Sequence, residues 1–294
     1  MMGSKALAIP FSRYSGRLKL ISKDIPEHLL SNRYLRDFYF YLVNNRDKFP
    51  AGFDFDLNEF KSDINKGLFF DSDIPQGYGV GSSGALVASV FNAYSGIRYM
   101  SLQEDQLPDL KRYFSFMESC FHGKSSGLDP LISYINKPIL VSSSEKIEMV
   151  CFPNNEIKSD YEIFLLDTEI TSSTELLVQK FMENLNDESY KNLIVSGLIP
   201  LNESCVDSLL HGRITEFMKK IELLSTLQLE CFDGMISDKY REFWMEGLIT
   251  GEYYLKLCGS GGGGFILGFT RDFTNTESYF RKNGVKLVQV FNSR

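Results

Sequence analysis

The chain has 294 residues, of which 43% are hydrophobic and 23% charged, and its formal net charge is −7 at pH 7. This length suits one large domain or two ordinary ones, and the composition is that of a soluble globular protein. The acidic balance argues against a nucleic-acid partner and against a polybasic membrane contact. No stretch approaches the roughly 20 apolar residues of a membrane span, and no adequate signal peptide is present, so we expect a cytoplasmic protein.

Cysteine and histidine usage argues against two classes of site. The three histidines lack the spacing of a zinc site. The five cysteines are odd in number and free of any Cys-x-x-Cys spacing, which indicates reduced thiols in or near the core rather than a disulfide framework. They are Cys120, Cys151, Cys205, Cys231 and Cys258.

The first half of the chain predicts mixed strands and helices, from apolar alternation and from apolar residues at helical spacing. The predicted strands lie within 6–22, over 53–57 and 68–70, and within 131–152. The predicted helices cover 26–45, 85–94 and 102–121. A turn-rich segment over 122–130 follows the third helix, which carries Glu118.

The second half begins where polarity rises, around 153–155, so we expect two domains over 1–154 and 155–294. Its predicted strands cover 163–166, 253–257 and 265–269. Its predicted helices cover 175–186, 203–224 and 238–249.

Two glycine-rich loops are the most informative feature of the sequence. One lies within 73–86 and the other within 256–265, each between an apolar strand-like run and another regular element. Such loops let backbone N–H groups converge on an anion without Cβ atoms in the way, which favours a polyphosphate ligand. Neither is a Walker A loop, because no Gly-Lys-Ser/Thr closes either one.

The two loops differ in how well a simple packing turn explains them. The first opens onto a helix, where first-turn N–H groups and the macrodipole favour phosphate. Ser82 and Ser83 at that helix start can cap it or ligate Mg²⁺, although glycine turns before helices also occur for packing alone. The second loop has four consecutive glycines, Gly261 to Gly264, which leave room for another backbone or a ligand.

Two acidic residues supply what the glycine loops lack. Mg-ATP needs an oxygen ligand for the metal, commonly a carboxylate. An acceptor hydroxyl needs a group that orients it or takes its proton. Glu118 and Asp129 can share these two roles between them. Considered alone, Glu118 is typical of a solvated charge on a helix and Asp129 is typical of a turn residue.

Three segments together resemble the GHMP small-molecule kinases, named for galactokinase, homoserine kinase, mevalonate kinase and phosphomevalonate kinase. They are Pro75-x-Gly-x-Gly-x-Gly-Ser-Ser-Gly-Ala85, Glu118 with His122-Gly-x-Ser-Ser-Gly-x-Asp129, and Lys256-x-x-Gly-Ser-Gly-Gly-Gly-Gly264. The middle segment is most similar to mevalonate kinases. Asp167-Thr with Ser173-Thr174 resembles a further family segment, and the resemblance spans about residues 5–270.

The resemblance implies an α+β, two-domain GHMP kinase fold. Its amino-terminal domain would be of the ribosomal protein S5 domain 2 type and its carboxy-terminal domain ferredoxin-like, with ATP bound between them. The implied cofactors are ATP and Mg²⁺, the metal held by Ser83 and Glu118. Asp129 would be the catalytic residue facing the acceptor hydroxyl. The residues implied to contact ATP are Gly77, Gly79, Gly81, Ser82, Ser83, Gly84, Gly259, Gly261 and Gly262, with Gly263 also shaping the second loop.

Other positions carry weaker expectations. Thr174 is a candidate ATP or substrate contact, and His122 is expected to shape its turn rather than to catalyse. Gly84 stands where the family usually has Ala, and Ser125 stands where it usually has Pro. Both are small replacements that we expect to be tolerated.

One family motif is missing. The amino-terminal strand and its lysine, which neutralises charge near the transferred phosphoryl group, have no counterpart, and Lys5 aligns with a later position. A start assigned too far downstream is the expected reason, with a trimmed chain or a loss of activity as alternatives.

The resemblance implies ATP-dependent phosphorylation of a small alcohol, most specifically of mevalonate at its 5-hydroxyl in isoprenoid biosynthesis. Phosphomevalonate kinase and diphosphomevalonate decarboxylase are the alternatives within the family. Both bind an extra phosphate, whereas Lys124 is an isolated cation near Asp129. A non-catalytic nucleotide-binding homologue is the alternative from another class. The expected partner is a small-molecule substrate, with no nucleic acid and no membrane, and a homodimer is left open.

Overall fold

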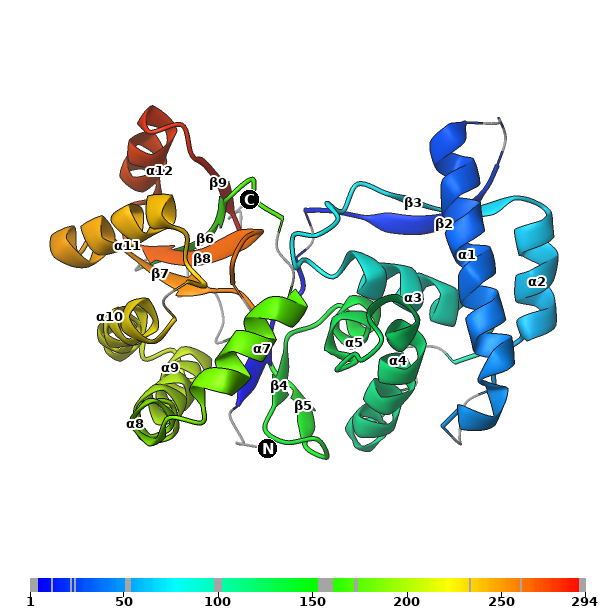
Figure 1. The fold of residues 1–294 in the computed structure, drawn as a ribbon, viewed down its shortest axis with the longest axis horizontal. Helices are drawn as coiled ribbons and strands as arrows, with labels where there is room; N and C mark the ends of the chain where they lie inside the picture. The colour runs from blue at the N-terminus through cyan, green and yellow to red at the C-terminus, as the bar shows by residue number, and fades with distance from the viewer. Residues whose placement is uncertain are drawn as a thin grey trace. The chain divides into compact units, whose positions relative to one another are not determined.

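The computed structural model describes residues 5–11, 13–21, 23, 25–50, 54–97, 102–152, 161–171, 174–232, 234–259 and 261–290. The chain forms two compact units (Figure 1). The amino-terminal unit comprises Ala8–Pro75 and Gly81–Met149, and the carboxy-terminal unit comprises Met1–Leu7, Gln76–Val80 and Val150–Arg294. The predicted domain limit at 154/155 lies outside the described residues and stays a prediction.

The amino-terminal unit packs its helices around one aromatic-rich core. Its helices are α1 (Pro26–Asn44), α2 (Leu57–Asn65), α3 (Ser82–Tyr94), α4 (Leu107–His122) and α5 (Leu128–Ile135), with short helical turns η1 (Arg46–Lys48) and η3 (Glu104–Gln106). Its strands are β2 (Gly16–Leu20), β3 (Leu68–Ser72), β4 (Ile139–Val141) and β5 (Ile147–Met149). Strands β2 and β3 form an antiparallel ribbon, and β4 and β5 form an antiparallel pair. Strand β1 (Ala6–Ala8) spans the limit between the two units, which falls after Leu7. Phe38, Phe60, Phe91 and Phe114 are fully buried in this core.

One sequence prediction in this unit is wrong. The strand predicted over 53–57 does not form in its described part, residues 54–57. Instead, the Asp56 side chain accepts hydrogen bonds from the backbone N–H groups of Asn58 and Glu59 and caps α2. The strands predicted within 131–152 are confirmed as β4 and β5, which follow α5.

The carboxy-terminal unit is built on one four-stranded antiparallel sheet. Its strands are β6 (Glu162–Asp167), β7 (Tyr253–Leu257), β8 (Phe265–Thr270) and β9 (Lys286–Gln289), in the order β7-β8-β6-β9. Its helical segments are α7 (Thr174–Asn184), α8 (Glu188–Asn192), η4 (Leu193–Leu198), α9 (Ile199–Leu210), α10 (Ile214–Cys231), α11 (Asp238–Thr250) and α12 (Phe273–Lys282).

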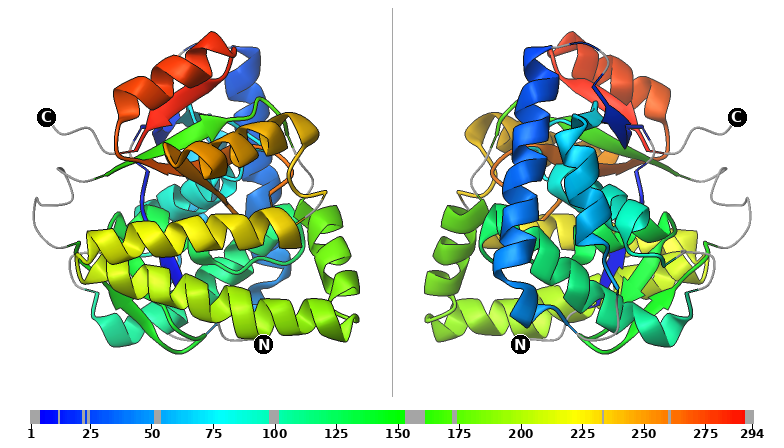
Figure 2. Two further views of the ribbon diagram at one scale, coloured as in Figure 1. Left: turned by 90° about the vertical axis from the view of Figure 1, so that its left-hand side faces the viewer. Right: turned by 90° about the vertical axis from the view of Figure 1, so that its right-hand side faces the viewer.

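Helices connect β6 to β7, a hairpin connects β7 to β8, and α12 connects β8 to β9 (Figure 2). This is the β-α-β-β-α-β order of a ferredoxin-like domain, as the resemblance implied.

The helices between β6 and β7 correct two expectations. The predicted helix over 203–224 is interrupted at 211–213 and is shared between α9 and α10. Within the helical run Glu188–Leu210, an 18-residue window has a mean hydropathy of 1.3, so by length and composition the run could cross a membrane, contrary to the expectation that no stretch approaches this. The run also carries Glu203 and Asp207.

The five cysteines are free thiols with two kinds of surroundings. Cys205 and Cys231 are buried and Cys120 is half-buried, as predicted for core or near-core thiols. Burial raises the pKa of the Cys120 and Cys205 thiols to about 11. Cys151 and Cys258 are exposed, which the sequence did not indicate.

Candidate active site

The first glycine loop leads into the amino terminus of α3. Gly81 is the N-cap of this helix and has a φ of 72°, a left-handed conformation that favours glycine. With no side chain at the cap, no side-chain hydrogen bond closes the helix start. The helix begins at Ser82, three residues earlier than predicted, so Ser82 and Ser83 lie in its first turn. A helix end of this kind is suited to an anion such as a phosphate.

Glu118 lies beside that helix start and is held by two hydroxyl groups. The Ser83 hydroxyl donates to Glu118 Oε1 at 3.0 Å, and the Ser125 hydroxyl donates to Oε2. The Glu118 side chain is only 4% exposed, so it is not a solvated helix charge. The segment before α5 fixes Ser125, because the Ser115 hydroxyl donates to the Ser125 carbonyl at 2.6 Å and the Gly127 N–H donates to the Ser125 hydroxyl oxygen at 3.0 Å.

Asp129 lies in the first turn of α5, and α5 packs directly on the start of α3. A Cβ built on Gly84 would lie 2.7 Å from the Asp129 carbonyl carbon and from the Pro130 nitrogen. A Cβ on Gly81 would lie 3.4 Å from the Asp129 Cβ. Asp129 itself is exposed. The amino-terminal unit therefore brings Gly81, Ser83, Glu118 and Asp129 together. The absence of a side chain at Gly84 allows the close packing of α3 on α5, because a Cβ there would require the two helices to shift.

The donor set of this cluster fits Mg²⁺. A carboxylate and a hydroxyl are hard oxygen ligands, and adjacent ligands of an octahedral Mg²⁺ with bonds of about 2.1 Å lie roughly 3.0 Å apart. The measured Ser83 Oγ to Glu118 Oε1 distance is 3.0 Å. No group of three or more His, Cys, Asp or Glu side chains suited to a metal occurs in the described ranges.

The second glycine loop is built differently from what its sequence predicts. The Gly262 N–H donates to the Met235 carbonyl at 2.6 Å, and the Gly264 N–H donates to the Ile170 carbonyl at 2.7 Å. A Cβ on Gly263 would lie 2.5 Å from the Ile170 carbonyl oxygen. These glycines permit close backbone packing, and two of their amides already have protein acceptors. The N–H groups of Gly262 and Gly264 are thus directed at protein carbonyls, and the predicted ATP contacts of this loop stay a prediction.

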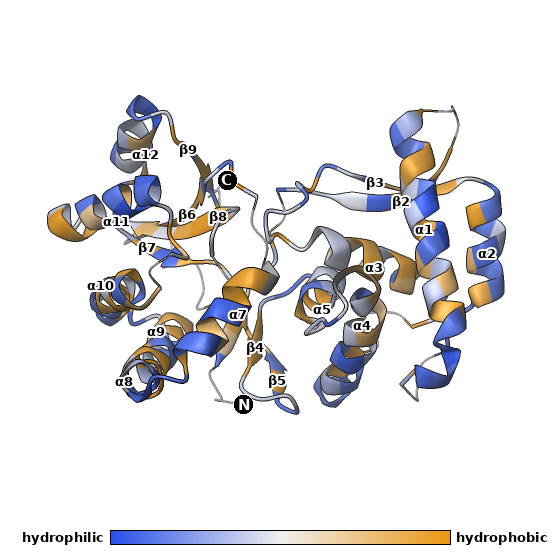
Figure 3. Cartoon of the chain, in the orientation of Figure 1, coloured by the Kyte–Doolittle hydropathy of each residue, from blue (hydrophilic) through white to orange (hydrophobic). Residues whose placement is uncertain are grey.

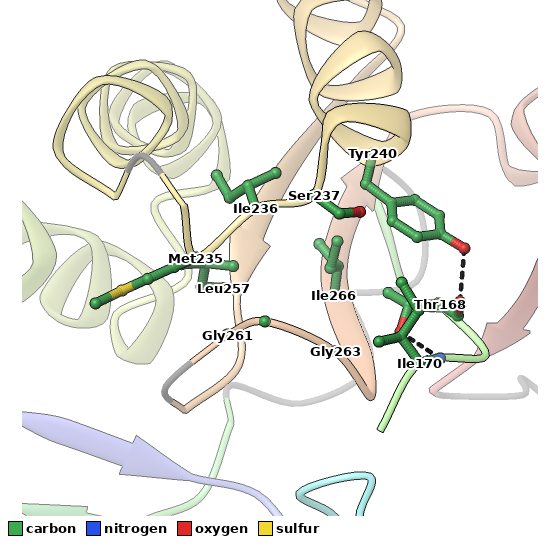
Figure 4. Close-up of a pocket in the computed structure, with 11 residues that line it drawn as sticks. Thr168, Ile170, Met235, Ile236, Ser237, Tyr240, Leu257, Gly261, Gly263 and Ile266 are labelled. Carbon is green, nitrogen blue, oxygen red and sulfur yellow. Dashed lines mark hydrogen bonds between the residues drawn. The ribbon is translucent and has the colours of Figure 1, made fainter. Parts of the chain in front are cut away.

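A small pocket lies beneath this loop (Figure 4). Its volume is about 10 Å³, room for a single water molecule and far too little for a nucleotide. The Tyr240 hydroxyl donates to the Thr168 carbonyl at 2.8 Å, and the Thr168 hydroxyl donates to the Gly264 carbonyl at 2.7 Å. These bonds tie the end of β6 to the loop and to α11.

Residues 77–79 belong to the same unit as the second loop. The Tyr78 ring packs on Phe265 with 5.5 Å between centroids, and a Cβ on Gly264 would collide with the Tyr78 carbonyl oxygen. Gly77 lies near Thr171, whereas Gly79, like Gly259, has no atom within 4 Å of where a Cβ would be. The predicted site residues thus fall into two groups, one in each unit, joined by the peptide bond between residues 80 and 81.

Sequence reasoning missed Ser125, Thr168 and Tyr78 as parts of these groups. Ser125 lies within the motif that carries Asp129, so its hydroxyl was a detectable signal. Thr168 and Tyr78 also lie within quoted segments, but their roles come from contacts with distant parts of the chain that those segments do not reveal. The side chains of Thr174 and His122 lie outside the described part, and their predicted roles stay predictions.

Comparison with known proteins agrees with this geometry. Residues 47–137 match the model of the GHMP kinases N terminal domain. Mevalonate kinase of L. major in complex with R-mevalonate superposes with a TM-score of 0.67 at 14% identity, covering 99% of this chain and 90% of that one. This chain has the GHMP kinase fold.

Two further GHMP kinases of known structure extend the likeness. Streptococcus pneumoniae phosphomevalonate kinase in complex with phosphomevalonate and AMPPNP has a TM-score of 0.61 at 14% identity, covering 98% of this chain and 94% of that one. Lactococcus lactis galactokinase complexed with galactose has a TM-score of 0.63 at 14% identity, covering 98% and 87%. A search of curated proteins finds no match. The predicted α+β GHMP fold is confirmed, and the three relatives differ in their small-molecule ligand.

Replacing Ser125 with Ala tests how the GHMP-type cluster holds its carboxylate. The change removes one of the two hydroxyl donors to Glu118, and hydrogen bonds to charged groups contribute about 1.5–3 kcal/mol. We expect the free energy of unfolding, measured by urea titration, to fall by about 1–3 kcal/mol. Ser126→Ala is the matched control, because the exposed Ser126 hydroxyl accepts only the Leu128 N–H at 3.2 Å. Equal losses in the two variants would contradict this role.

Proposed function

We propose that this chain is an ATP- and Mg²⁺-dependent kinase of the cytoplasm that phosphorylates a small alcohol, mevalonate at its 5-hydroxyl, in isoprenoid biosynthesis. The observation that carries the proposal is the pair of Ser83 and Glu118, 3.0 Å apart at the start of α3, with Asp129 beside them. The GHMP kinase fold supports the reaction class, and a relative solved with AMPPNP supports ATP as the donor.

Each residue of the cluster has a distinct role in this proposal. The first turn of α3, with Gly81, Ser82 and Ser83, would bind ATP phosphates through its amides and dipole. Ser83 and Glu118 would hold the Mg²⁺, which neutralises phosphate charge when bound. Asp129, exposed at the start of α5, would orient the acceptor hydroxyl and take its proton. Gly77, Gly79, Gly259, Gly261 and Gly262 are the further residues proposed to contact ATP.

Mevalonate is proposed as acceptor because the segment with Glu118 and Asp129 is most similar to mevalonate kinases, and because a mevalonate kinase with R-mevalonate shares the fold. An acceptor that already carries phosphate needs additional cations near Asp129. Within five residues of Asp129 in the sequence, Lys124 is the cation. A single lysine favours an acceptor without a phosphate group, such as mevalonate, over phosphomevalonate or diphosphomevalonate.

The test is mass-spectrometric detection of product from Mg-ATP with four acceptors in parallel: mevalonate, phosphomevalonate, diphosphomevalonate and galactose. We expect 5-phosphomevalonate from mevalonate, formed at least about 100-fold more slowly by the Asp129→Asn variant. If product formed only from another acceptor, the mevalonate assignment would be wrong and the proposed kinase activity would stand. Nucleotide binding without any turnover would identify a non-catalytic homologue instead.

A further inference from the structure

Helix α1 has two unlike faces. Leu35, Phe38 and Leu42 point into the core and are fully buried. On the opposite side Leu30 is 50% and Phe40 52% exposed, although both are large apolar residues. Figure 3 shows apolar and hydrophilic positions alternating along this helix, and in the right-hand view of Figure 2 it lies beside α2 at the front of its unit.

Exposed apolar side chains are concentrated on this segment. Of the sixteen large apolar residues that are exposed in the described part of the chain, seven lie within residues 20–43. These are Leu20, Ile25, Leu29, Leu30, Tyr34, Phe40 and Val43. Scattered apolar side chains need no explanation, but five of the seven lie on the single helix α1, namely Leu29, Leu30, Tyr34, Phe40 and Val43, which indicates an interaction surface.

The spacing on the outer face is that of a helix-pairing seam. Leu30, Arg33, Asp37 and Phe40 follow one another at intervals of three, four and three residues, so they form a single stripe. All four are exposed. Arg33 and Asp37 form no ion pair with any residue of the described ranges. The stripe therefore presents one positive and one negative charge, each without an ion-pair partner, between two apolar residues.

This stripe is complementary to itself when reversed. Two copies of this helix can pair antiparallel so that Leu30 of one faces Phe40 of the other. In the same register, Arg33 of one faces Asp37 of the other. The same two contacts recur on the other side of the two-fold axis, as an isologous interface requires. The pair thus has two ion pairs at its centre and an apolar contact at each end.

We propose that the outer face of α1 is the interface of a symmetric homodimer, in which α1 packs antiparallel on α1 of a second copy of this chain. An anionic membrane suits the face less well, because the exposed Glu27 and Asp37 offset the exposed Arg33 and Arg36. An apolar partner protein would bury Arg33 and Asp37 without offering either charge a new partner, which is unfavourable. The second copy is the occupant that satisfies both the charges and the apolar residues.

Sedimentation equilibrium of the full chain, with charge-reversal variants, tests the register directly. Arg33→Asp or Asp37→Arg alone converts both ion pairs into like-charge contacts, and we expect the dimer dissociation constant to rise by about tenfold or more. The double variant Arg33→Asp with Asp37→Arg restores both pairs and should return the dissociation constant to within about threefold of wild type.

Phe40→Glu tests the apolar contact and should also give monomers. Ile249→Glu is its matched control, since Ile249 is 80% exposed on α11, and it should leave the dimer intact. Circular dichroism checks that each variant is folded. A monomeric wild-type chain, a dimer that survives both single reversals, or a double variant no better than the singles would overturn the proposal. A monomer that binds anionic vesicles would identify a membrane as the occupant instead.

Discussion

Replacing Asp129 with Asn is expected to lower the turnover of the proposed kinase by about 100- to 10,000-fold, the range over which a positioned acid or base contributes. Asn keeps the size and shape of the side chain but cannot accept a proton at a carboxylate. The contacts that place Asp129 beside Gly84 and Gly81 involve its backbone and Cβ, which Asn retains. Loss of turnover should therefore occur without loss of fold.

The measurement is steady-state formation of phosphorylated product, with the melting temperature followed in parallel. Asp109→Asn is the matched control, because Asp109 lies in the first turn of α4 and makes an exposed pair with Arg112. It should change turnover by less than about twofold, as surface ion pairs contribute little. An Asp129→Asn enzyme that keeps turnover within tenfold of wild type would remove Asp129 from the catalytic role.

Replacing Gly84 with Ala is expected to destabilise the protein by about 1–3 kcal/mol, the usual cost of inserting a methyl group into a packed interior. The new Cβ would lie 2.7 Å from backbone atoms of Asp129 and Pro130, so α3 and α5 must move apart. The same movement would displace Asp129 from Ser83 and reduce turnover as well as stability.

Gly197→Ala is the control for this change. Gly197 also lies in a helical segment, but its nearest neighbours would be side-chain carbons at 3.7 Å and 3.9 Å, which is ordinary contact. Removing a glycine from a helix there should stabilise the chain by up to about 1 kcal/mol. Urea unfolding curves of the two variants should shift in opposite directions. A Gly84→Ala curve that coincides with wild type would show that the helices adjust without loss.

The sequence was most predictive where a local pattern determines local structure. The glycine and serine pattern before α3 predicted a helix start suited to phosphate, and Gly81 is its N-cap. The heptad-like apolar spacing over 102–121 predicted the helix that carries Glu118, and α4 is that helix. Three motifs in order were enough to indicate the GHMP fold, although no single one would have been.

The sequence predictions failed where the local structure depends on hydrogen bonds or contacts that the neighbouring residues alone do not determine. Alternating Phe and Asp over 53–57 suggested a strand, but Asp56 forms better hydrogen bonds as a helix cap than it would exposed on an edge strand. Ser125 in place of the usual Pro was expected to be merely tolerated. Its hydrogen bond to Glu118 could not be foreseen, because it depends on how the segment before α5 returns toward α4. The sequence could not show that the Met235 and Ile170 carbonyls accept hydrogen bonds from the second glycine loop, because both residues lie far from this loop along the chain.

The hydrogen bonds of that second loop have a consequence for its entropy. A run of glycines is ordinarily the most flexible kind of backbone, and ordering it when a ligand binds is unfavourable. Here the Gly262 and Gly264 amides are held by carbonyls of the folded chain. The part of the loop from Gly262 to Gly264 is therefore preorganised, and a ligand that contacts it there loses little affinity to ordering of these residues.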